Sequence, residues 1–564
     1  MPTRREFIRN GTCVAATSFA GRSAIAAFEP PIAPVSGSKP NIILILADDM
    51  GFSDIGCFGS EISTPNLDRL ASRGIRISQF YNNPRCCPSR ASIMTGLYSQ
   101  QAGMGMMTSD YARYPYPGYV GDLSAQTLTV SEALKSVGYN TAMVGKWHLT
   151  PTENEAPGIS KHNWPLQRGF DKYWGMISGS SVYFNSKALV HDNDPIPMPG
   201  APESYLTDLW AEHAVSYVDE LAKTKNPFFL YCAFNAPHWP LQAPEDLIQK
   251  YSRRYAGGWD ALREERHQKQ ISMGVVDARW PLSPRDPRVP AWDKAGDKEW
   301  EMRRMAVYAA MIDRLDEGIG RILAKVEETG IAENTLILFM SDNGGNAEEL
   351  GRPANTAPGM LRGNSPNVMP GPANTFESIG IPWGNCANTP FRLYKHYTQE
   401  GGISTPFIAC WPKVIQSSNT PVNAVGHETD LMPTFLEISG AKYPDRIKAG
   451  PLPALAGESL VPIFAGKSRD RAPIYWEHEG NRAVRDGRWK LVSRYTESWE
   501  LHDMEADRTE MRNLAQAESD RVKTMSKMYD AWANRVGVQP WPMPQTPQRE
   551  RGADLEIPPY LKKG

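Results

Sequence analysis

The chain has 564 residues, well beyond the roughly 250–300 at which a single hydrophobic core stops growing, so we expect one large domain and a smaller one. Hydrophobic residues make up 41% and charged residues 22%, the composition of an ordinary soluble globular protein. The formal net charge of −2 has no strong sign, which argues against nucleic acid or an anionic membrane as a partner.

The first residues have the pattern of an export signal. Arg4 and Arg5 precede a mildly apolar stretch, residues 11–20, and an A-x-A cleavage pattern follows at residues 24–26. Twin-arginine signals of this kind carry folded proteins out of a bacterial cytoplasm. The stretch is too short and polar to span a bilayer, and no other segment has the roughly 18 consecutive apolar residues of a membrane helix. We expect residues 1–37 to be a signal and linker, the twin-arginine export machinery to be a partner, and the protein to be periplasmic or secreted. A disordered basic amino-terminus is the alternative.

Cysteine spacing indicates neither a zinc cluster nor a dense disulfide framework, because no C-x-x-C pair occurs. One of the seven cysteines, Cys13, falls in the signal, and six remain: Cys57, Cys86, Cys87, Cys232, Cys386 and Cys410. One or two disulfides stay open after export.

The first predicted elements alternate between strand and helix. Residues 41–47 form a continuous apolar run, typical of a strand buried on both faces of a parallel sheet. Thr64 and Pro65 suit the start of a helix, which we expect to end at Gly74. A capping box at residues 129–132 predicts a second helix, and it leads into a strand at residues 141–144.

The alternation continues to about residue 465. Residues 228–234 predict a strand, apolar residues at helical spacing between 305 and 326 predict a long helix, and residues 335–340 predict another buried strand. This order predicts an α/β domain over residues 38–465, with a large doubly wound mixed sheet sandwiched by helices.

The pattern changes after residue 465. Short segments at residues 472–476, 481–486, 489–493 and 499–501, followed by a helical stretch at 518–536, predict a smaller α+β domain over residues 466–564 with an antiparallel sheet. Its proline-rich end, from residue 540, is expected to be irregular.

Polar side chains follow four of the predicted strands. Ligands bind beyond the carboxyl ends of strands in open α/β sheets, and these ends carry Asp48 and Asp49, Asp342 and Asn343, Lys146 and His148, and His238. This convergence predicts an active site. The two acidic pairs offer only oxygen donors, which Ca²⁺ or Mg²⁺ prefers and zinc does not. An ordinary turn after a strand would explain either pair alone.

The segment CCPSRASIMTG, residues 86–96, is the most specific signal. Pro88 suits the first turn of a helix and would place Cys86 just before the helix amino-terminus, where backbone N–H groups favour negative charge. Two adjacent cysteines alone would favour a structural or reactive thiol pair.

Cys-x-Pro-Ser-Arg followed by Thr-Gly resembles the signature of the formylglycine-dependent sulfatases of the alkaline phosphatase superfamily. Only Cys86 fits, because reading from Cys87 would place Ser89 where proline belongs. Residues 40–56, 145–148, 236–238, 341–344, 395–402 and 499–503 resemble further sulfatase motifs in the same order. The resemblance covers nearly the whole mature chain, is strongest to bacterial arylsulfatases, and implies an alkaline phosphatase-like fold.

The resemblance also implies a set of roles. Cys86, oxidised to formylglycine by a maturation enzyme, would be nucleophile and metal ligand, and one divalent cation, Ca²⁺ with Mg²⁺ as the alternative, would take its other ligands from Asp48, Asp49, Asp342 and Asn343. Asp342 would also help to deprotonate the attacking hydroxyl. The remaining roles fall to Arg90 and Lys146, which would orient the hydrated aldehyde, to His148 as the base, and to His238 and Lys395 at the leaving alcohol.

The implied reaction is hydrolysis of a small sulfate monoester. One hydroxyl of the hydrated aldehyde attacks sulfur, and the other then loses its proton so that sulfate is expelled. An arylsulfatase-like activity is expected, with a carbohydrate sulfatase or a phosphate or phosphonate monoester hydrolase as alternatives. A catalytically silent glycan-binding protein would have lost Cys86 or an acidic pair. Residues 176–201 and Trp239 are expected to wall the pocket, and residues 257–293 to form a lid or surface loop.

Overall fold

The computed structural model describes residues 38–108, 114–151, 160–351 and 359–544. Residues 1–37, predicted to be a twin-arginine signal and linker, and the chain beyond residue 544 lie outside these ranges. From Ser38 onward the chain forms one compact unit, so the domain boundary near residue 465 stays a prediction. Within the described ranges, no helix is long and apolar enough to cross a membrane.

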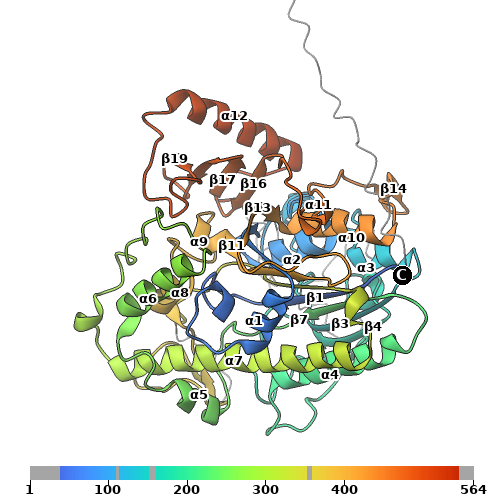
Figure 1. Cartoon of the computed structure of the whole chain (residues 1–564), viewed down its shortest axis with the longest axis horizontal. Coiled ribbons are helices and arrows are strands. Elements are labelled where there is room, and N and C mark those ends of the chain that lie inside the picture. The colour runs from blue at the N-terminus through green and yellow to red at the C-terminus, as the bar shows by residue number, and fades with distance from the viewer. Residues whose placement is uncertain (1–37, 109–113, 152–159, 352–358, 545–564) are drawn as a thin grey trace, which may run out of the picture. The chain divides into compact units, whose positions relative to one another are not determined.

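An eleven-stranded mixed sheet forms the centre of the fold (Figure 1). Its strands, in spatial order, are β11 (Ser404–Thr405), β2 (Ile75–Tyr81), β12 (Phe407–Cys410), β8 (Thr335–Ser341), β1 (Asn41–Ala47), β7 (Phe228–Ala233), β3 (Asn140–Lys146), β4 (Lys172–Met176), β5 (Val190–His191) and β6 (Asp194–Pro195), with β13 (Val422–His427) paired to β2. The five strands from β8 to β4 are parallel, whereas β12 runs antiparallel to β8 and β2. The predicted fold class is confirmed.

Helices cover both faces of the sheet because successive side chains of a strand point in opposite directions. Ile43 and Ile45 pack into one core, with α4 (Leu206–Ala222) and the long α7 (Lys298–Glu328). Ile42 and Leu44 pack into the other. That second core contains α2 (Cys86–Thr95), α3 (Val130–Lys135) and α10 (Leu431–Ser439), which lie across the sheet from α4 and α7 (Figure 1).

The predicted helix starts are largely found. Pro65 is the first residue of α1 (Pro65–Ser72), although the Thr64 side chain makes no capping hydrogen bond. The capping box at α3 is confirmed, because the Glu132 N–H donates to Thr129 Oγ1 at 3.2 Å and the Thr129 N–H donates to Glu132 Oε2 at 2.7 Å.

A second sheet, of four antiparallel strands, lies near the carboxy-terminus: β16 (Ile474–His478), β17 (Asn481–Asp486), β18 (Trp489–Ser493) and β19 (Glu500–Asp503). Helix α12 (Ser519–Val536) packs on it through Met525, Tyr529 and Trp532. We call this sheet, its helix and the loops that join them the carboxy-terminal layer, residues 474–536.

The expectation of a lid or surface loop at residues 257–293 is met only in the second half, where residues 273–291 are irregular and mostly exposed or partly exposed. Most of the first half is helix α6 (Gly258–Ser272), and its Trp259, Arg263 and Arg266 are buried. The Arg266 guanidinium reaches Asp54 Oδ1 at 2.7 Å and Glu61 Oε2 at 2.8 Å. One face of α6 therefore belongs to the interior, next to the chain that follows β1.

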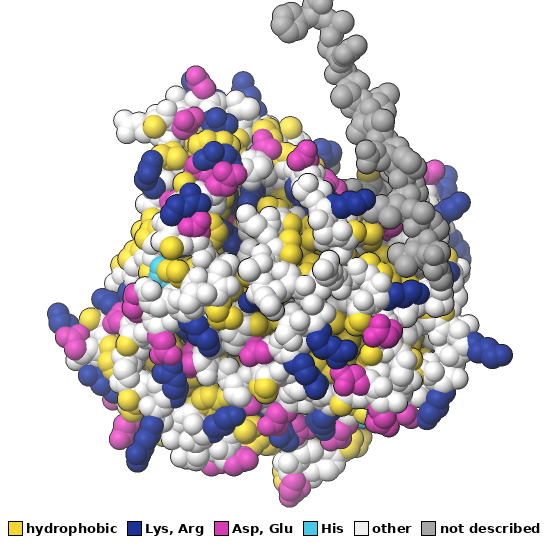
Figure 2. Space-filling model, in the orientation of Figure 1, with side chains coloured by type: hydrophobic (Ala, Val, Ile, Leu, Met, Phe, Trp, Pro, Cys, Tyr) yellow, Lys and Arg dark blue, Asp and Glu magenta, His cyan; other side chains and the backbone are white. Residues whose placement is uncertain are grey.

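The six described cysteines are buried and free, so no disulfide occurs among them. On the face of the molecule that Figure 2 shows, basic and acidic side chains are interspersed and neither sign dominates.

Candidate active site

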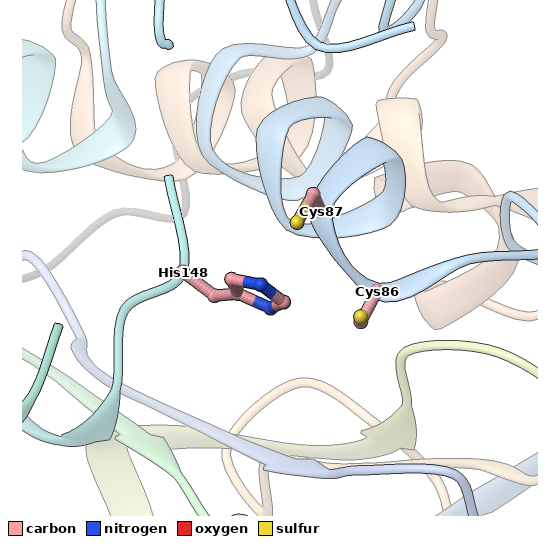
Figure 3. Close-up of side chains that lie close together, drawn as sticks. All are labelled: Cys86, Cys87 and His148. Carbon is pink, nitrogen blue, oxygen red and sulfur yellow. The ribbon is translucent and has the colours of Figure 1, made fainter. Parts of the chain in front are cut away.

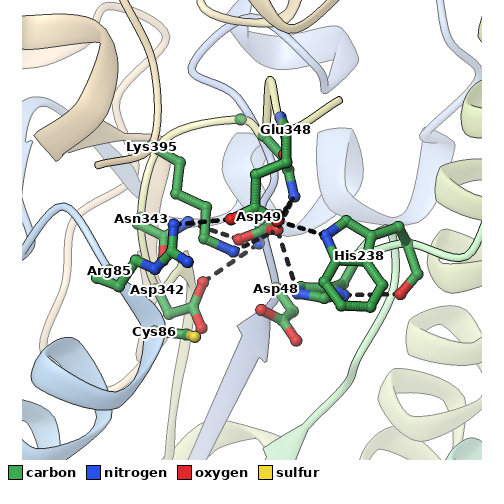
Figure 4. A network of polar contacts seen from close by, with 12 residues as sticks. Asp48, Asp49, Arg85, Cys86, His238, Asp342, Asn343, Glu348 and Lys395 are labelled. Atoms are coloured by element: carbon green, nitrogen blue, oxygen red, sulfur yellow. Dashed lines mark hydrogen bonds and ion pairs between the residues drawn. The ribbon is translucent and has the colours of Figure 1, made fainter. Parts of the chain in front are cut away.

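Four adjacent parallel strands bring the predicted residues to one edge of the sheet. In the register of β1 with β8, Ala47 pairs with Ser341, so Asp48 and Asp342 leave the sheet side by side. The Asp342 N–H donates to Ala47 O at 3.1 Å. Asp49, Asp342 and Asn343 gather around one point with His238 and Lys395 (Figure 4).

Cys86 joins this group from the other side, at the start of α2. It is the first residue of the helix, with Arg85 as the N-cap, and not the residue before it as expected. Its sulfur lies next to Asp342 (Figure 4) and its side chain is fully buried. Position 86 thus lies beside the acidic side chains, as the sequence predicts.

The oxygen-rich group has the properties of a site for a hard cation. Asp48, Asp49 and Asp342 have no exposed surface, and burial and the neighbouring Asp48 raise the pKa of Asp342 to about 8. Asp48 Oδ1 and Asn343 Oδ1 are buried without a hydrogen-bond partner. A bound divalent cation would satisfy both oxygens and stabilise the clustered carboxylates, so these donors fit Ca²⁺ or Mg²⁺.

Three cationic side chains hold the carboxylates in place. Lys146 Nζ donates to Asp48 Oδ2 at 2.6 Å, and Lys395 Nζ donates to Asp49 Oδ2 at 2.8 Å. Arg90 donates through Nε to Asp342 Oδ2 at 3.0 Å and through Nη1 to Lys146 O at 2.8 Å. Its Nη2 makes no hydrogen bond and lies 3.8 Å from Asp48 Oδ2, so its N–H groups are able to donate to a ligand.

His148 and His238 lie on different sides of the group of acidic side chains. His148 lies against Cys86 and Cys87 (Figure 3), and burial lowers its pKa to about 4. His238 donates from Nδ1 to Trp239 O at 2.7 Å, since a carbonyl oxygen only accepts, and its Nε2 lies 3.5 Å from Asp49 Oδ2. Burial also lowers the pKa of His238 to about 4, so both rings are neutral at pH 7.

Comparison with known proteins agrees with this site. Residues 40–441 match the Sulfatase family, and the chain is 32% identical over 532 residues to an uncharacterized sulfatase of Schizosaccharomyces pombe, covering 89% of this chain and 94% of that protein. This chain belongs to the sulfatase family. It is a sulfuric ester hydrolase.

Further proteins that are similar to this sulfatase support the same family assignment. The chain is 32% identical over 464 residues to an arylsulfatase of Klebsiella aerogenes, covering 77% of this chain and 94% of that enzyme. The crystal structure of Ps i-CgsB in complex with k-i-k-neocarrahexaose has a TM-score of 0.64 at 26% identity, covering 88% of this chain and 93% of that one. Residues 391–533 match the family described as N-sulphoglucosamine sulphohydrolase, C-terminal.

Three further polar residues of the sulfatase site are not among those predicted from the sequence. Asn346 Nδ2 donates to Asp49 Oδ2 at 2.8 Å. Glu348 accepts from Trp239 Nε1 at 2.7 Å and pairs with Arg85 Nη1 at 2.7 Å. Each lies within six residues of a recognised motif, because Arg85 precedes Cys86, and Asn346 and Glu348 follow Asn343. This nearness to the motifs is the feature of the sequence from which they could have been predicted.

The expected pocket wall is only partly found. Trp239 is partly exposed and packs against Phe376, with ring centroids 5.6 Å apart. Tyr183 is instead fully buried, and its hydroxyl donates towards Asn235 O and His238 O at 2.7 and 2.9 Å. These hydrogen bonds hold the backbone of residues 235–238, the loop that carries His238. His191 is exposed on β5, which lies between β4 and β6 near the edge of the sheet.

Proposed function

We propose that this sulfatase hydrolyses sulfate monoesters through a formylglycine formed from Cys86, with one divalent cation, Ca²⁺, held by Asp48, Asp49, Asp342, Asn343 and the modified residue. The observation that carries the proposal is the pair of buried, unpartnered oxygens, Asp48 Oδ1 and Asn343 Oδ1, in the same group as the Cys86 side chain. When bound, the cation would supply positive charge to the sulfate oxygens. The hydrated aldehyde would supply a nucleophilic hydroxyl and a second hydroxyl through which sulfate is released.

The cationic side chains bind and orient the anionic ester. Arg90 Nη2, which makes no hydrogen bond, is a fixed donor in a buried site, where a positioned charge stabilises a developing negative charge far more than in water. Lys146 is held by Asp48 and lies on the same side as Arg90. Neither side chain has to reorganise when the ester binds, because both are already held by hydrogen bonds.

The protonation states support distinct roles for the side chains that move protons. His148 is neutral at pH 7 and lies against Cys86, so it is able to accept a proton there. Lys395 remains an ammonium group, since Asp49 and Glu348 outweigh the effect of burial and raise its pKa. It therefore keeps a proton at working pH, and we assign it as the donor to the leaving oxygen; His238, neutral in the free site, lies beside it.

Mass spectrometry tests the nucleophile. The Cys86 peptide of the active enzyme should be about 18 mass units lighter than the thiol form, or appear as its hydrate. Fully active enzyme with an unmodified Cys86 would falsify the assignment. Rates with p-nitrophenyl sulfate, p-nitrophenyl phosphate and a phosphonate ester separate sulfatase activity from the related hydrolases.

The natural substrate is proposed to be an aryl or a sugar sulfate. Likeness to the Klebsiella arylsulfatase supports the first. The structure of Ps i-CgsB with a neocarrahexaose supports the second, as does the polar surrounding of Trp239, whose indole N–H donates to Glu348. A screen of aryl sulfates against sulfated sugars decides between them. We further propose export by the twin-arginine route and maturation by a formylglycine-generating enzyme.

A further inference from the structure

Lys395 lies in a loop whose backbone is held in an unfavourable conformation. We call residues 392–400 the Lys395 loop. Leu393 and His396 flank Lys395 and have φ angles of 61° and 88°, in the left-handed region that non-glycine residues rarely adopt. Such conformations persist only where the surrounding structure imposes them. The loop therefore needs an external support to keep Lys395 Nζ at 2.8 Å from Asp49 Oδ2.

The far end of the Lys395 loop is fixed by buried charges. Glu400 accepts from Lys490 Nζ at 2.8 Å, from Arg508 Nε at 2.9 Å and from the Tyr81 hydroxyl at 2.8 Å. The Glu400, Lys490 and Arg508 side chains have no exposed surface. Burial alone would raise the pKa of Glu400, but Lys490 and Arg508 lower it to about 2, so the carboxylate is charged at every working pH.

Glu510 connects Lys490 to both ends of the loop. It accepts the Glu400 N–H at 3.1 Å and pairs with Lys490 Nζ at 2.8 Å. It also lies 3.5 Å from Arg392 Nε at the start of the loop. Lys490 belongs to β18, and Arg508 and Glu510 follow β19. All three thus belong to the carboxy-terminal layer, and none reaches the reacting groups directly.

We propose that Lys490, Arg508 and Glu510 are positioning residues for Lys395, so that the carboxy-terminal layer sets the rate of proton donation to the leaving group. The proposal rests on the proposed role of Lys395. The alternative is a purely structural network that stabilises the layer and leaves catalysis unaffected.

The test is a double-mutant cycle on the mature, cation-loaded enzyme with Lys490→Met and Lys395→Ala. Lys490→Met should lower kcat by up to about a hundredfold, since a shift of about 1 Å in a catalytic group has an effect of that size. In the Lys395→Ala background it should change kcat by less than about twofold, because its effect passes through the missing ammonium group. Equal effects in both backgrounds would overturn the proposal.

The dependence of the rate on the leaving group gives a second test. If the network only stabilised the fold, its loss would not change the ratio of the rates for phenyl sulfate and p-nitrophenyl sulfate. Phenolate is a poorer leaving group than p-nitrophenolate and depends more on protonation. Lys395→Ala and Lys490→Met should therefore both slow phenyl sulfate more than p-nitrophenyl sulfate, with KM little changed. Glu477→Gln is the matched control. This buried carboxyl of the same sheet accepts from Tyr119 and Gln100 and does not touch the Lys395 loop. The ratio of the phenyl sulfate rate to the p-nitrophenyl sulfate rate should therefore be the same in this variant as in the wild type.

Glu510→Gln is the second variant if Lys490→Met fails to fold. It keeps the acceptor for the Glu400 N–H and loses the charge, and it should reproduce the altered rate ratio. An unchanged ratio in a folded Glu510→Gln enzyme would refute the proposal. Full activity of Lys395→Ala would instead refute the role of Lys395 itself, and with it this inference.

Discussion

Replacement of Arg266 by methionine is expected to destabilise the protein strongly, because it removes a buried cation that is bonded to two buried carboxylates, Asp54 and Glu61. Arg266 donates to Asp54 Oδ1 at 2.7 Å, to Glu61 Oε2 at 2.8 Å and Oε1 at 3.0 Å, and to Ser53 Oγ at 3.0 Å. The Arg266 and Asp54 side chains have no exposed surface, and Glu61 is 4% exposed. Methionine keeps much of the volume and removes the charge.

The expected loss is about 3–5 kcal/mol of unfolding free energy, the usual result of leaving buried charges without their partner. The loss should depend on pH. Burial raises the pKa of Asp54 even with Arg266 beside it, so without Arg266 that pKa rises further. A carboxyl group whose folded pKa lies above its unfolded value of about 3.9 destabilises the fold at higher pH. The deficit should therefore shrink as the pH falls towards that value.

Urea unfolding followed by tryptophan fluorescence measures the effect, with Arg263→Met as the matched control. Arg263 lies in the same helix and is also buried, but its guanidinium donates to the neutral oxygens of Ser283 at 2.7 and 2.8 Å. Its replacement should cost about 1 kcal/mol. Adding Asp54→Asn and Glu61→Gln to Arg266→Met should recover most of the loss. Equal losses for the two arginines, or no recovery in the triple variant, would refute the reasoning.

Three further outcomes concern the site. Cys86→Ala should abolish turnover of p-nitrophenyl sulfate, whereas Cys87→Ala should largely preserve it. The opposite result would mean that the signature has been aligned to the wrong cysteine. Dialysis against a chelator should remove activity and added Ca²⁺ should restore it; activity that survives with no metal detectable by elemental analysis would contradict the proposed cation. Burial lowers the pKa of His148 to about 4 in the free site. If His148 is the base, as proposed, kcat/KM should fall only when acidification protonates it. A pH–rate profile that already falls at the ordinary histidine pKa of about 6.5 would argue against this role.

Regular patterns in the sequence were sufficient to predict the centre of the sheet. The apolar runs of β1, β7 and β8 agree with the observed strands to within one residue. The polar residues that follow them meet because carboxyl ends of adjacent parallel strands share an edge. Resemblance then identified which of two adjacent cysteines faces that edge.

Elements that bury polar side chains were not predictable in this way. On α6 the buried face includes Arg263, Arg266 and Gln270, so its periodicity resembles that of an exposed helix. The partners that make this burial tolerable, Asp54 and Glu61, lie more than 200 residues away in the chain. Strand β2 was overlooked for the same reason, because three of its seven buried residues are polar.

The backbone amides of the site have a consequence for its dynamics. The Asp48 N–H donates to Ala236 O and the Asp342 N–H donates to Ala47 O, each at 3.1 Å, so both residues continue the hydrogen-bond ladder of the central strands. Their exchange with deuterium should require the opening of the whole sheet and not the fluctuation of a loop. The carboxylates proposed to bind the cation would then remain in place for as long as the core itself stays folded.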